Sequence, residues 1–265
     1  MPLSRLGLRD GDHRSFGSRI IGGWTSFLRR ELLFIWRALW RARTINMLGL
    51  RLPARHRLIS ASVRRSIYRE NYERPELATV VRNVRPGDRV LECGAGIGAV
   101  SAASALIVGR SNVIAIEADP RMREVIELTW QLNGVSPTLL TGFVTNVTGE
   151  EEIAVDANLV STGRARQEGR GERRTVPRLR LKDLLIEYQP SVLVMDIEGA
   201  EVDLLVLDEI RMLRLICVEV HPHLIGNDRC LDLIVRLRDL GLKLVIDQSA
   251  FRCLVFERDG DALSA

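Results

Sequence analysis

The stretch VLECGAGIGAVS, residues 90–101, combines an apolar run, an acidic residue and three alternating glycines. The apolar run ends in Glu92, and Gly94, Gly96 and Gly98 follow before a sequence that favours a helix. Glycine adopts positive φ angles and has no β-carbon, so such a backbone turns sharply and approaches a ligand closely. A strand, a glycine turn and a helix N-terminus in this order predict a nucleotide-type binding site.

Two classes of cofactor fit this glycine loop (residues 94–98). The loop matches the dinucleotide fingerprint G-x-G-x-x-G/A, and with Glu92 it also matches the acidic-x-G-x-G-x-G motif of enzymes that use S-adenosylmethionine (SAM). A carboxylate at the strand end would repel a pyrophosphate but suits the ammonium group of SAM, directly or through water. Glu92 therefore favours SAM, and a tight turn without a ligand remains an alternative.

A second acidic strand end follows the loop at a suitable distance. Residues 113–116 read VIAI, a buried-strand pattern, and continue as Glu117-Ala118-Asp119-Pro120. An acid roughly 20 residues beyond the glycine loop typically accepts hydrogen bonds from ribose hydroxyls. We assign this role to Glu117, whereas Asp119 is predicted to cap the next helix. This element does not separate SAM from NAD, because both contain an adenosine ribose.

The third element points to a family. Residues 192–201 read VLVMDIEGAE, and a later strand, residues 215–220, ends in His221-Pro222-His223. With Tyr72-Glu73 and the RPGD sequence at residues 85–88, this pattern resembles the FkbM family of SAM-dependent methyltransferases over about residues 70–247. The chain departs from the family pattern at three positions: Glu92 replaces a usual Asp, Ile97 replaces a polar residue, and Met195 replaces a common Lys.

The resemblance implies transfer of a methyl group from SAM to a hydroxyl of a sugar, a glycan or another small-molecule acceptor. Two other classes stay open: a methyltransferase fold used as a non-catalytic binding module, and an NAD-dependent oxidoreductase. The motifs and the resemblance together predict these cofactor-binding residues: Tyr72, Glu73, Glu92, Gly94, Gly96, Gly98, Glu117, Ala118, Asn146 and Asp196.

Candidate catalytic residues follow the later strands, because α/β sheets bind ligands at the carboxyl ends of their strands. A hydroxyl is a poor nucleophile at neutral pH, so a general base is expected. The candidates are His221, Asp196 and Glu219, with Glu198 and His223 nearby. His221 has the most suitable ordinary pKa, although a structural role in its turn is an alternative. Asp196 and Glu219 would also suit Mg²⁺, but we predict no metal.

Alternating strand and helix patterns predict an α/β fold with a doubly wound, mostly parallel, seven-stranded sheet of the Rossmann-like methyltransferase type. Strands are expected near residues 89–93, 112–117, 138–144, 191–196, 214–220, 242–247 and 252–257. Helices are expected near residues 98–108, 120–133, 200–210 and 228–240. The Gly- and Arg-rich segment 148–178 interrupts this rhythm, which indicates a mobile loop over the substrate or a surface hairpin.

The expected organisation is a disordered N-terminus (1–19), a basic helical extension (20–69), the catalytic domain (70–258) and a tail (259–265). Residues 1–89 contain 19 Arg and 7 acidic residues, so the basic charge is concentrated there. The four cysteines include no C-x-x-C pair, which predicts a reduced, cytoplasmic protein without a zinc site. The sequence leaves the oligomeric state open.

The basic extension contains a helical pattern at residues 24–43 with three tryptophans and interspersed arginines. Its longest apolar run has five residues, whereas a membrane span needs about 20. A basic amphipathic helix with tryptophan suits an anionic membrane surface, such as the inner face of a membrane. We favour the alternative, in which Trp36 and its neighbours pack on the catalytic domain or on a second subunit, and we expect no nucleic-acid contact.

Overall fold

The computed structural model describes residues 30–155, 172–250 and 252–258. At its centre is a seven-stranded sheet in which β12 runs antiparallel to both neighbours and all other pairs are parallel. In spatial order its strands are β11 (Leu242–Leu244), β12 (Cys253–Arg258), β10 (Leu215–Glu219), β9 (Val192–Met195), β3 (Val90–Cys93), β4 (Val113–Glu117) and β5 (Thr138–Thr141). The predicted fold class is therefore confirmed, with each strand close to its expected position.

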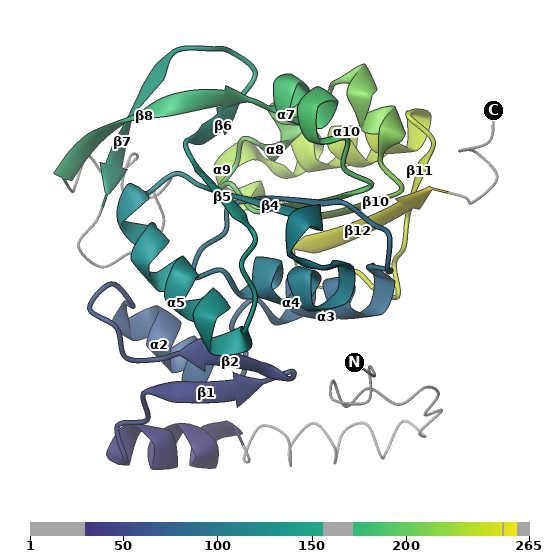
Figure 1. The fold of residues 1–265 in the computed structure, drawn as a ribbon. Coiled ribbons are helices and arrows are strands. Elements are labelled where there is room, and N and C mark those ends of the chain that lie inside the picture. The colour runs from purple at the N-terminus through teal and green to yellow at the C-terminus, as the bar shows by residue number, and fades with distance from the viewer. Residues whose placement is uncertain (1–29, 156–171, 251, 259–265) are drawn as a thin grey trace, which may run out of the picture.

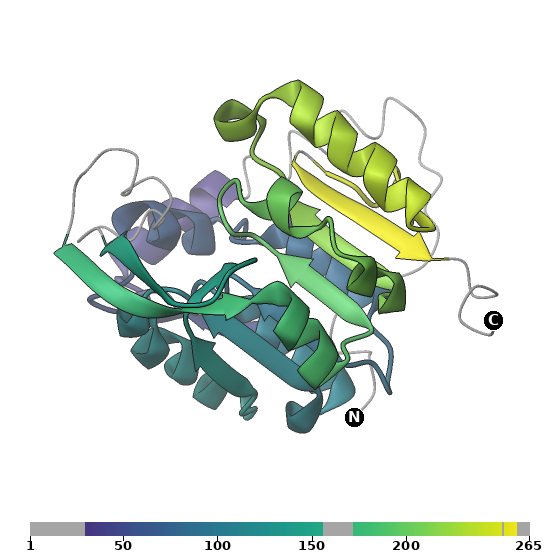
Figure 2. The ribbon, with the colours of Figure 1, turned by 90° about the horizontal axis from the view of Figure 1, so that it is seen from above.

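Helices cover both faces of this sheet (Figures 1 and 2). One face packs against α3 (Arg74–Asn83), α4 (Ala99–Val108) and α5 (Arg123–Asn133), and the other against α7 (Leu181–Tyr188), α8 (Glu201–Leu204) and α10 (Asn227–Asp239). Short helical segments complete the layers: η2 (Arg110–Asn112), η3 (Pro120–Met122), η4 (Asp208–Met212) and α9 (Pro222–Ile225). The helix expected at 200–210 is thus divided between α8 and η4.

The central strands β3 and β9 are apolar apart from Glu92, because both of their faces are buried. Along β3, Val90 belongs to one hydrophobic cluster and Leu91 to the other, as the two-residue period of a strand requires. Every residue of β3 and β9 is buried. Such strands read as continuous apolar runs rather than as alternating patterns, which is why the sequence shows them clearly.

The N-terminal extension is part of the same core from residue 44 onward. It consists of the hairpin β1 (Thr44–Met47) and β2 (Leu50–Pro53), followed by α2 (Ala61–Tyr68). The backbone of Arg51 exchanges two hydrogen bonds with the Asn133 side chain at the end of α5. Leu50 and Leu52 are buried in the cluster that also contains Val125 of α5. The expected boundary near residue 70 therefore marks no break in the packing.

A helix at residues 30–39 precedes this hairpin, and its packing differs from our expectation. Trp36 is 57% exposed, so the expectation that Trp36 packs on the domain is wrong. The inward face of the helix carries Phe34 and Arg37. The ring centres of Phe34 and Tyr68 are 6.5 Å apart, and Arg37 donates a hydrogen bond to the Tyr68 carbonyl. Aromatic and ionic contacts on one face hold this helix, while its tryptophans point outward.

In the segment 148–178, for which we predicted a mobile loop or a surface hairpin, the described residues form paired strands. β7 (Glu150–Val155) and β8 (Glu172–Arg180) pair antiparallel, and β6 (Phe143–Thr145) pairs with β8, giving a small three-stranded sheet. The surface-hairpin alternative is thus correct for these residues, and cross-strand pairs such as Arg178–Glu151 stabilise them. Residues 156–171, and the predicted terminal segments 1–19 and 259–265, lie outside the described residues.

All four cysteines are free and buried. None of the helices in the described part of the chain has the length and apolarity that crossing a bilayer requires.

Candidate active site

The glycine loop turns tightly between the end of β3 and the start of α4. Gly94 has a φ of +92°, and a β-carbon there would lie 1.9 Å from the carbonyl oxygen of Asp196. The amides of Gly94 and Ala95 both donate to the carbonyl of Ile116 on the next strand. Only glycine permits this close approach, so the loop is fixed against the ends of β4 and β9.

Tyr72 and Glu73 lie over the middle of the same loop. A β-carbon on Gly96, which has a φ of +54°, would lie 2.7 Å from Tyr72 Oη and 2.9 Å from Glu73 Oε1. Glu73 itself has a left-handed backbone (φ +43°) at the start of α3, and its Oε2 atom is buried without a hydrogen-bond partner. Burial, together with the nearby Glu92 charge, raises the pKa of Glu73 well above its usual range.

Glu117, at the end of β4, holds two loops through its carboxylate. Its Oε2 atom accepts a hydrogen bond from Gly96 N at 2.9 Å, and its Oε1 atom accepts one from Asp119 N at 2.9 Å. Burial raises the pKa of Glu117 to about 7 although these hydrogen bonds favour the carboxylate. Each carboxylate oxygen can accept a second hydrogen bond, so Glu117 can still accept hydrogen bonds from ribose hydroxyls, as predicted from the sequence.

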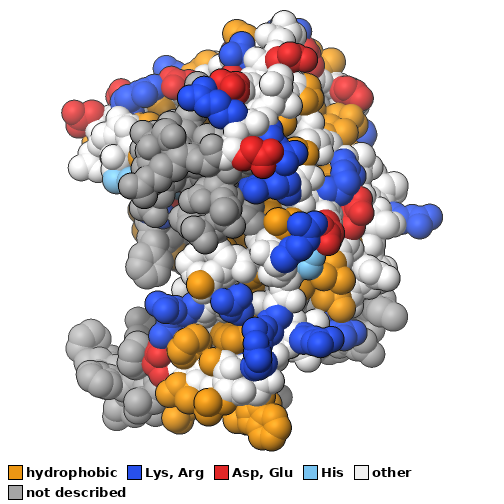
Figure 3. Space-filling model, turned by 90° about the vertical axis from the view of Figure 1, so that its left-hand side faces the viewer, with side chains coloured by type: hydrophobic (Ala, Val, Ile, Leu, Met, Phe, Trp, Pro, Cys, Tyr) orange, Lys and Arg blue, Asp and Glu red, His pale blue; other side chains and the backbone are white. Residues whose placement is uncertain are grey.

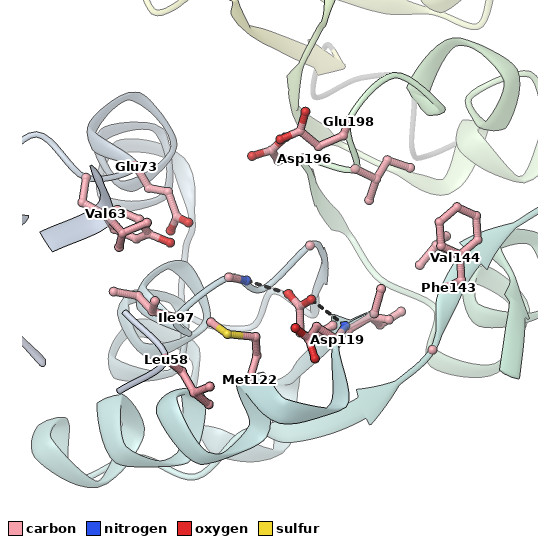
Figure 4. Close-up of a pocket in the computed structure, with 18 of the residues that line it drawn as sticks. Leu58, Val63, Glu73, Ile97, Asp119, Met122, Phe143, Val144, Asp196 and Glu198 are labelled. Atoms are coloured by element: carbon pink, nitrogen blue, oxygen red, sulfur yellow. Dashed lines mark hydrogen bonds between the residues drawn. The ribbon is translucent and has the colours of Figure 1, made fainter. Parts of the chain in front are cut away.

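These elements surround a cavity of about 290 Å³ (Figure 4). Seven of the predicted cofactor-binding residues line it: Tyr72, Glu73, Gly94, Gly96, Glu117, Ala118 and Asp196. Apolar residues that the motifs did not reveal also line it, among them Leu58, Ile59, Val63, Met122 and Phe143. Three of these, Leu58, Ile59 and Val63, come from the N-terminal extension, which the sequence patterns gave no reason to place at the site.

The remaining predicted cofactor residues lie outside this lining. Glu92 is buried, with an exposed fraction of 2%, and one of its carboxylate oxygens has no hydrogen-bond partner. Burial raises its pKa to about 8, so it affects the site as a buried acid rather than as part of the wall. Gly98 packs against α5, and Asn146 Nδ2 donates to the Asp203 carbonyl at 2.7 Å. The adenine contact of Asn146 stays a prediction.

The second half of the site is a group of three carboxylates around one imidazole, which we call the His221 cluster (Asp196, Glu198, Glu219 and His221). His221 is 2% exposed, and its Nε2 atom lies 3.6 Å from Glu198, 3.7 Å from Asp196 and 3.9 Å from Glu219. Asp196 and Glu198 line the cavity, across from Leu58 and Met122 (Figure 4). Parallel strand ends thus bring together residues far apart in the sequence, as predicted.

Two of the sequence candidates lie at the edge of this cluster or away from it. Glu219 forms an ion pair with Arg252 at 2.7 Å, which balances its charge. His223 is exposed and lies 3.3 Å from the same arginine. The cavity lining includes neither of them.

Glu201 is a site residue whose role the sequence did not reveal. Its side chain is fully buried, and its Oε1 atom lies 3.2 Å from His221 Nδ1. The same oxygen accepts hydrogen bonds from the amides of Ile197 and Gly199. Glu201 therefore both shapes the turn after β9 and orients the imidazole. The available signal was its position in the EGAE sequence, where it is the first residue of α8.

Charge and burial shift the pKa values of the cluster. Burial, followed by the charges of Glu219 and Glu198, raises the pKa of Asp196 well above its usual range. Burial of His221 favours the neutral form, but the hydrogen bond and charge of Glu201 outweigh it and raise the pKa of the imidazole. Asp196, Glu198 and His221 are also close enough together to hold a metal ion, a set that differs from the Asp196 and Glu219 pair considered from the sequence.

Comparison with known proteins settles the family. The model of the methyltransferase FkbM domain matches residues 92–244, from the glycine loop to β11. The chain belongs to the FkbM methyltransferase family. It is therefore a SAM-dependent methyltransferase by family, and the match includes Glu92, the glycine loop, Glu117 and the His221 cluster. No curated protein matches the chain.

Solved methyltransferase structures resemble this fold at low sequence identity. Precorrin-6y C5,15-methyltransferase from Geobacter metallireducens has 11% identity and a TM-score of 0.45, covering 72% of this chain and 89% of that one. A methyltransferase from Pyrococcus furiosus has 13% identity and a TM-score of 0.44, and the match covers 87% of this chain and 98% of that one. Aeropyrum pernix fibrillarin, solved with S-adenosyl-L-methionine, has 15% identity and a TM-score of 0.34, and the match covers 65% of this chain and 66% of that one.

The residues of the cavity fit SAM. The cofactor carries a positive sulfonium and an ammonium group, and the cavity contains buried acidic oxygens without hydrogen-bond partners, on Glu73 and Asp196. A buried carboxylate without a partner is costly, and a bound cation relieves that cost. Tyr72, Glu73, Glu117 and the glycine loop would hold the cofactor, and its bound form supplies a methyl group on a positively charged sulfur.

Proposed function

We propose that this protein methylates a hydroxyl group of a sugar, a glycan or another small-molecule acceptor. The observation that carries the proposal is the His221 cluster, which faces the cavity through Asp196 and Glu198. A hydroxyl must lose its proton as it is methylated, and this cluster offers the proton acceptors. The family resemblance supports an oxygen acceptor, because similar enzymes are associated with sugar and macrolide hydroxyls.

Two members of the cluster have different positions: Asp196 lines the cavity, and His221 lies behind it. Asp196 lines the cavity, so we propose that its carboxylate binds the acceptor hydroxyl and receives its proton. His221 Nδ1 faces the Glu201 carboxylate, which only accepts hydrogen bonds, so in the neutral ring Nδ1 carries the proton. Nε2 is then free to accept, and it lies 3.7 Å from Asp196 Oδ1. The pair can share the proton that leaves the hydroxyl.

The test is methyl transfer from isotope-labelled SAM to fractions of the source cell, read by mass spectrometry. Label on an oxygen supports the proposal, and label on nitrogen or carbon overturns the choice of acceptor. With an acceptor in hand, His221→Ala should lower turnover by about 10²–10⁴-fold and leave the affinity for S-adenosylhomocysteine unchanged. His223→Ala, an exposed neighbour, is the matched control and should retain wild-type turnover.

Asp196→Asn should lower turnover and also weaken acceptor binding, because Asp196 is the member of the pair that lines the cavity. Wild-type turnover by His221→Ala would show that the histidine is structural. Wild-type turnover by both variants would leave catalysis to positioning alone.

Our proposal uses no metal, and chelation tests this point separately. Activity should be the same with and without EDTA. If EDTA abolishes turnover and Mg²⁺ restores it, then Asp196, Glu198 and His221 are better interpreted as metal ligands.

A further inference from the structure

The helix at residues 30–39 and the residue after it expose a continuous apolar stripe. Each of its five members lies three or four positions from another member, so together they share one face of the helix. Their exposed fractions are Leu32 66%, Ile35 52%, Trp36 57%, Leu39 76% and Trp40 73%. The rings of Trp36 and Trp40 lie 6.4 Å apart. Contiguous exposed apolar side chains of this size indicate an interaction site rather than scattered surface residues.

Contacts on the opposite face fix the orientation of the stripe. Arg69 pairs with Glu31 through two hydrogen bonds of 2.7 Å, and its guanidinium lies 4.6 Å from the centre of the Phe34 ring. Arg37 donates to Glu70 and to the Tyr68 carbonyl, both at 2.6 Å. Because these contacts hold the helix to α2, the apolar stripe faces away from the protein.

The surface around the stripe is strongly basic. Residues 30–69 contain ten arginines and one acidic residue, Glu31, which is already paired with Arg69. Figure 3 shows hydrophobic side chains along one edge of the molecule, with Lys and Arg side chains gathered directly beside them. Exposed arginines in this region are Arg41, Arg43, Arg51, Arg55, Arg57 and Arg65, of which Arg57 pairs with Glu124 of α5.

We propose that this stripe inserts into the interface of a membrane that contains anionic lipids. Apolar residues with two tryptophans suit the boundary between headgroups and acyl chains, and the surrounding arginines suit the lipid phosphates. A second copy of the chain fits less well, because it would bring one arginine-rich rim against another. The charge around the stripe therefore selects an anionic bilayer surface over self-association.

Co-sedimentation of the full-length protein with vesicles tests this inference. We expect binding to vesicles that contain phosphatidylglycerol, little binding to phosphatidylcholine alone, and release as the salt concentration rises. Replacing both tryptophans (Trp36→Ser with Trp40→Ser) should lower vesicle partitioning roughly ten-fold or more. Ile246→Ser, which removes an isolated apolar side chain that is 78% exposed, is the matched control and should bind as the wild type does.

Two further measurements exclude a folding defect and a different occupant. The double variant should keep its affinity for S-adenosylhomocysteine, and lipids brominated near the headgroup should quench the tryptophan fluorescence of the wild-type protein. Failure of the wild type to bind anionic vesicles, or binding without quenching, would overturn the proposal. A dimer of the wild type that the double variant abolishes, without vesicle binding by either, would assign the stripe to self-association instead.

Discussion

His221 Nδ1 lies 3.2 Å from Glu201 Oε1, and this contact joins two buried side chains, one just after β10 and the other at the start of α8. Because the carboxylate raises the pKa of the imidazole, it makes His221 a stronger base, and it also sets which ring nitrogen is free. The same Glu201 oxygen accepts two backbone amides from the turn that carries Asp196 and Glu198. The orientation of the base and the shape of the cavity wall thus depend on one side chain.

Glu201→Gln should move the rising limb of the pH–turnover profile to lower pH. The neutral imidazole is the active form, and removing the Glu201 charge lowers the pKa at which His221 loses its proton. In the wild type, the contact between Glu201 and the protonated His221 stabilises the fold at pH values below the ordinary histidine pKa. This stabilisation is lost as the pH rises through the raised pKa of His221 and the imidazole loses its proton. The variant should therefore lose more thermal stability at pH 5 than at pH 8. An unchanged pH profile would show that Glu201 acts only on the turn.

Glu92→Gln should stabilise the ligand-free protein at pH 8 but hardly at pH 4.5. Burial raises the pKa of Glu92 from 4.5 to about 8, so the unfolded chain releases this proton at a lower pH than the folded protein does. The wild type consequently loses stability between these pH values, on the order of a few kcal/mol by pH 8. Thermal melts of both proteins across this range measure the effect. A stability difference that does not change with pH would contradict it.

Gly96→Ala should weaken binding of S-adenosylhomocysteine more than ten-fold, because the new methyl group meets Tyr72 and Glu73. Gly134→Ala is the matched control: Gly134 has a similar φ of +68°, but nothing lies within 4 Å of a β-carbon there. In both variants, alanine must adopt a left-handed backbone conformation, which costs about 1–2 kcal/mol. The difference between them in affinity therefore measures the contact over the glycine loop. Equal affinities would show that Tyr72 and Glu73 do not constrain the cofactor.

Glu117→Ala should lower cofactor affinity about ten- to a hundred-fold, because charge-assisted hydrogen bonds contribute roughly 1.5–3 kcal/mol. Circular dichroism should show an intact fold. Glu127→Ala, on the exposed side of α5, is the control and should bind as the wild type does. Unchanged affinity in Glu117→Ala would place the ribose elsewhere in the cavity.

The sequence predicted the sheet well because its central strands are buried on both faces and read as apolar runs, such as Val192–Met195. The glycine loop and the strand-end acids were predicted because each depends on local spacing. Glu201 and the apolar wall residues Leu58 and Val63 were not, since their roles arise from tertiary packing that local patterns do not record. Trp36 was misplaced for a related reason: an amphipathic pattern defines two faces of a helix but not which one packs inward.

Calorimetric titration of the purified protein with S-adenosylhomocysteine and, in parallel, with NAD tests the central claim most directly. Our account predicts saturable binding of S-adenosylhomocysteine at one site and far weaker binding of NAD, because acidic residues line the cavity where a pyrophosphate would have to lie. Preferential binding of NAD, or no binding of S-adenosylhomocysteine, would contradict the assignment of this cavity to SAM.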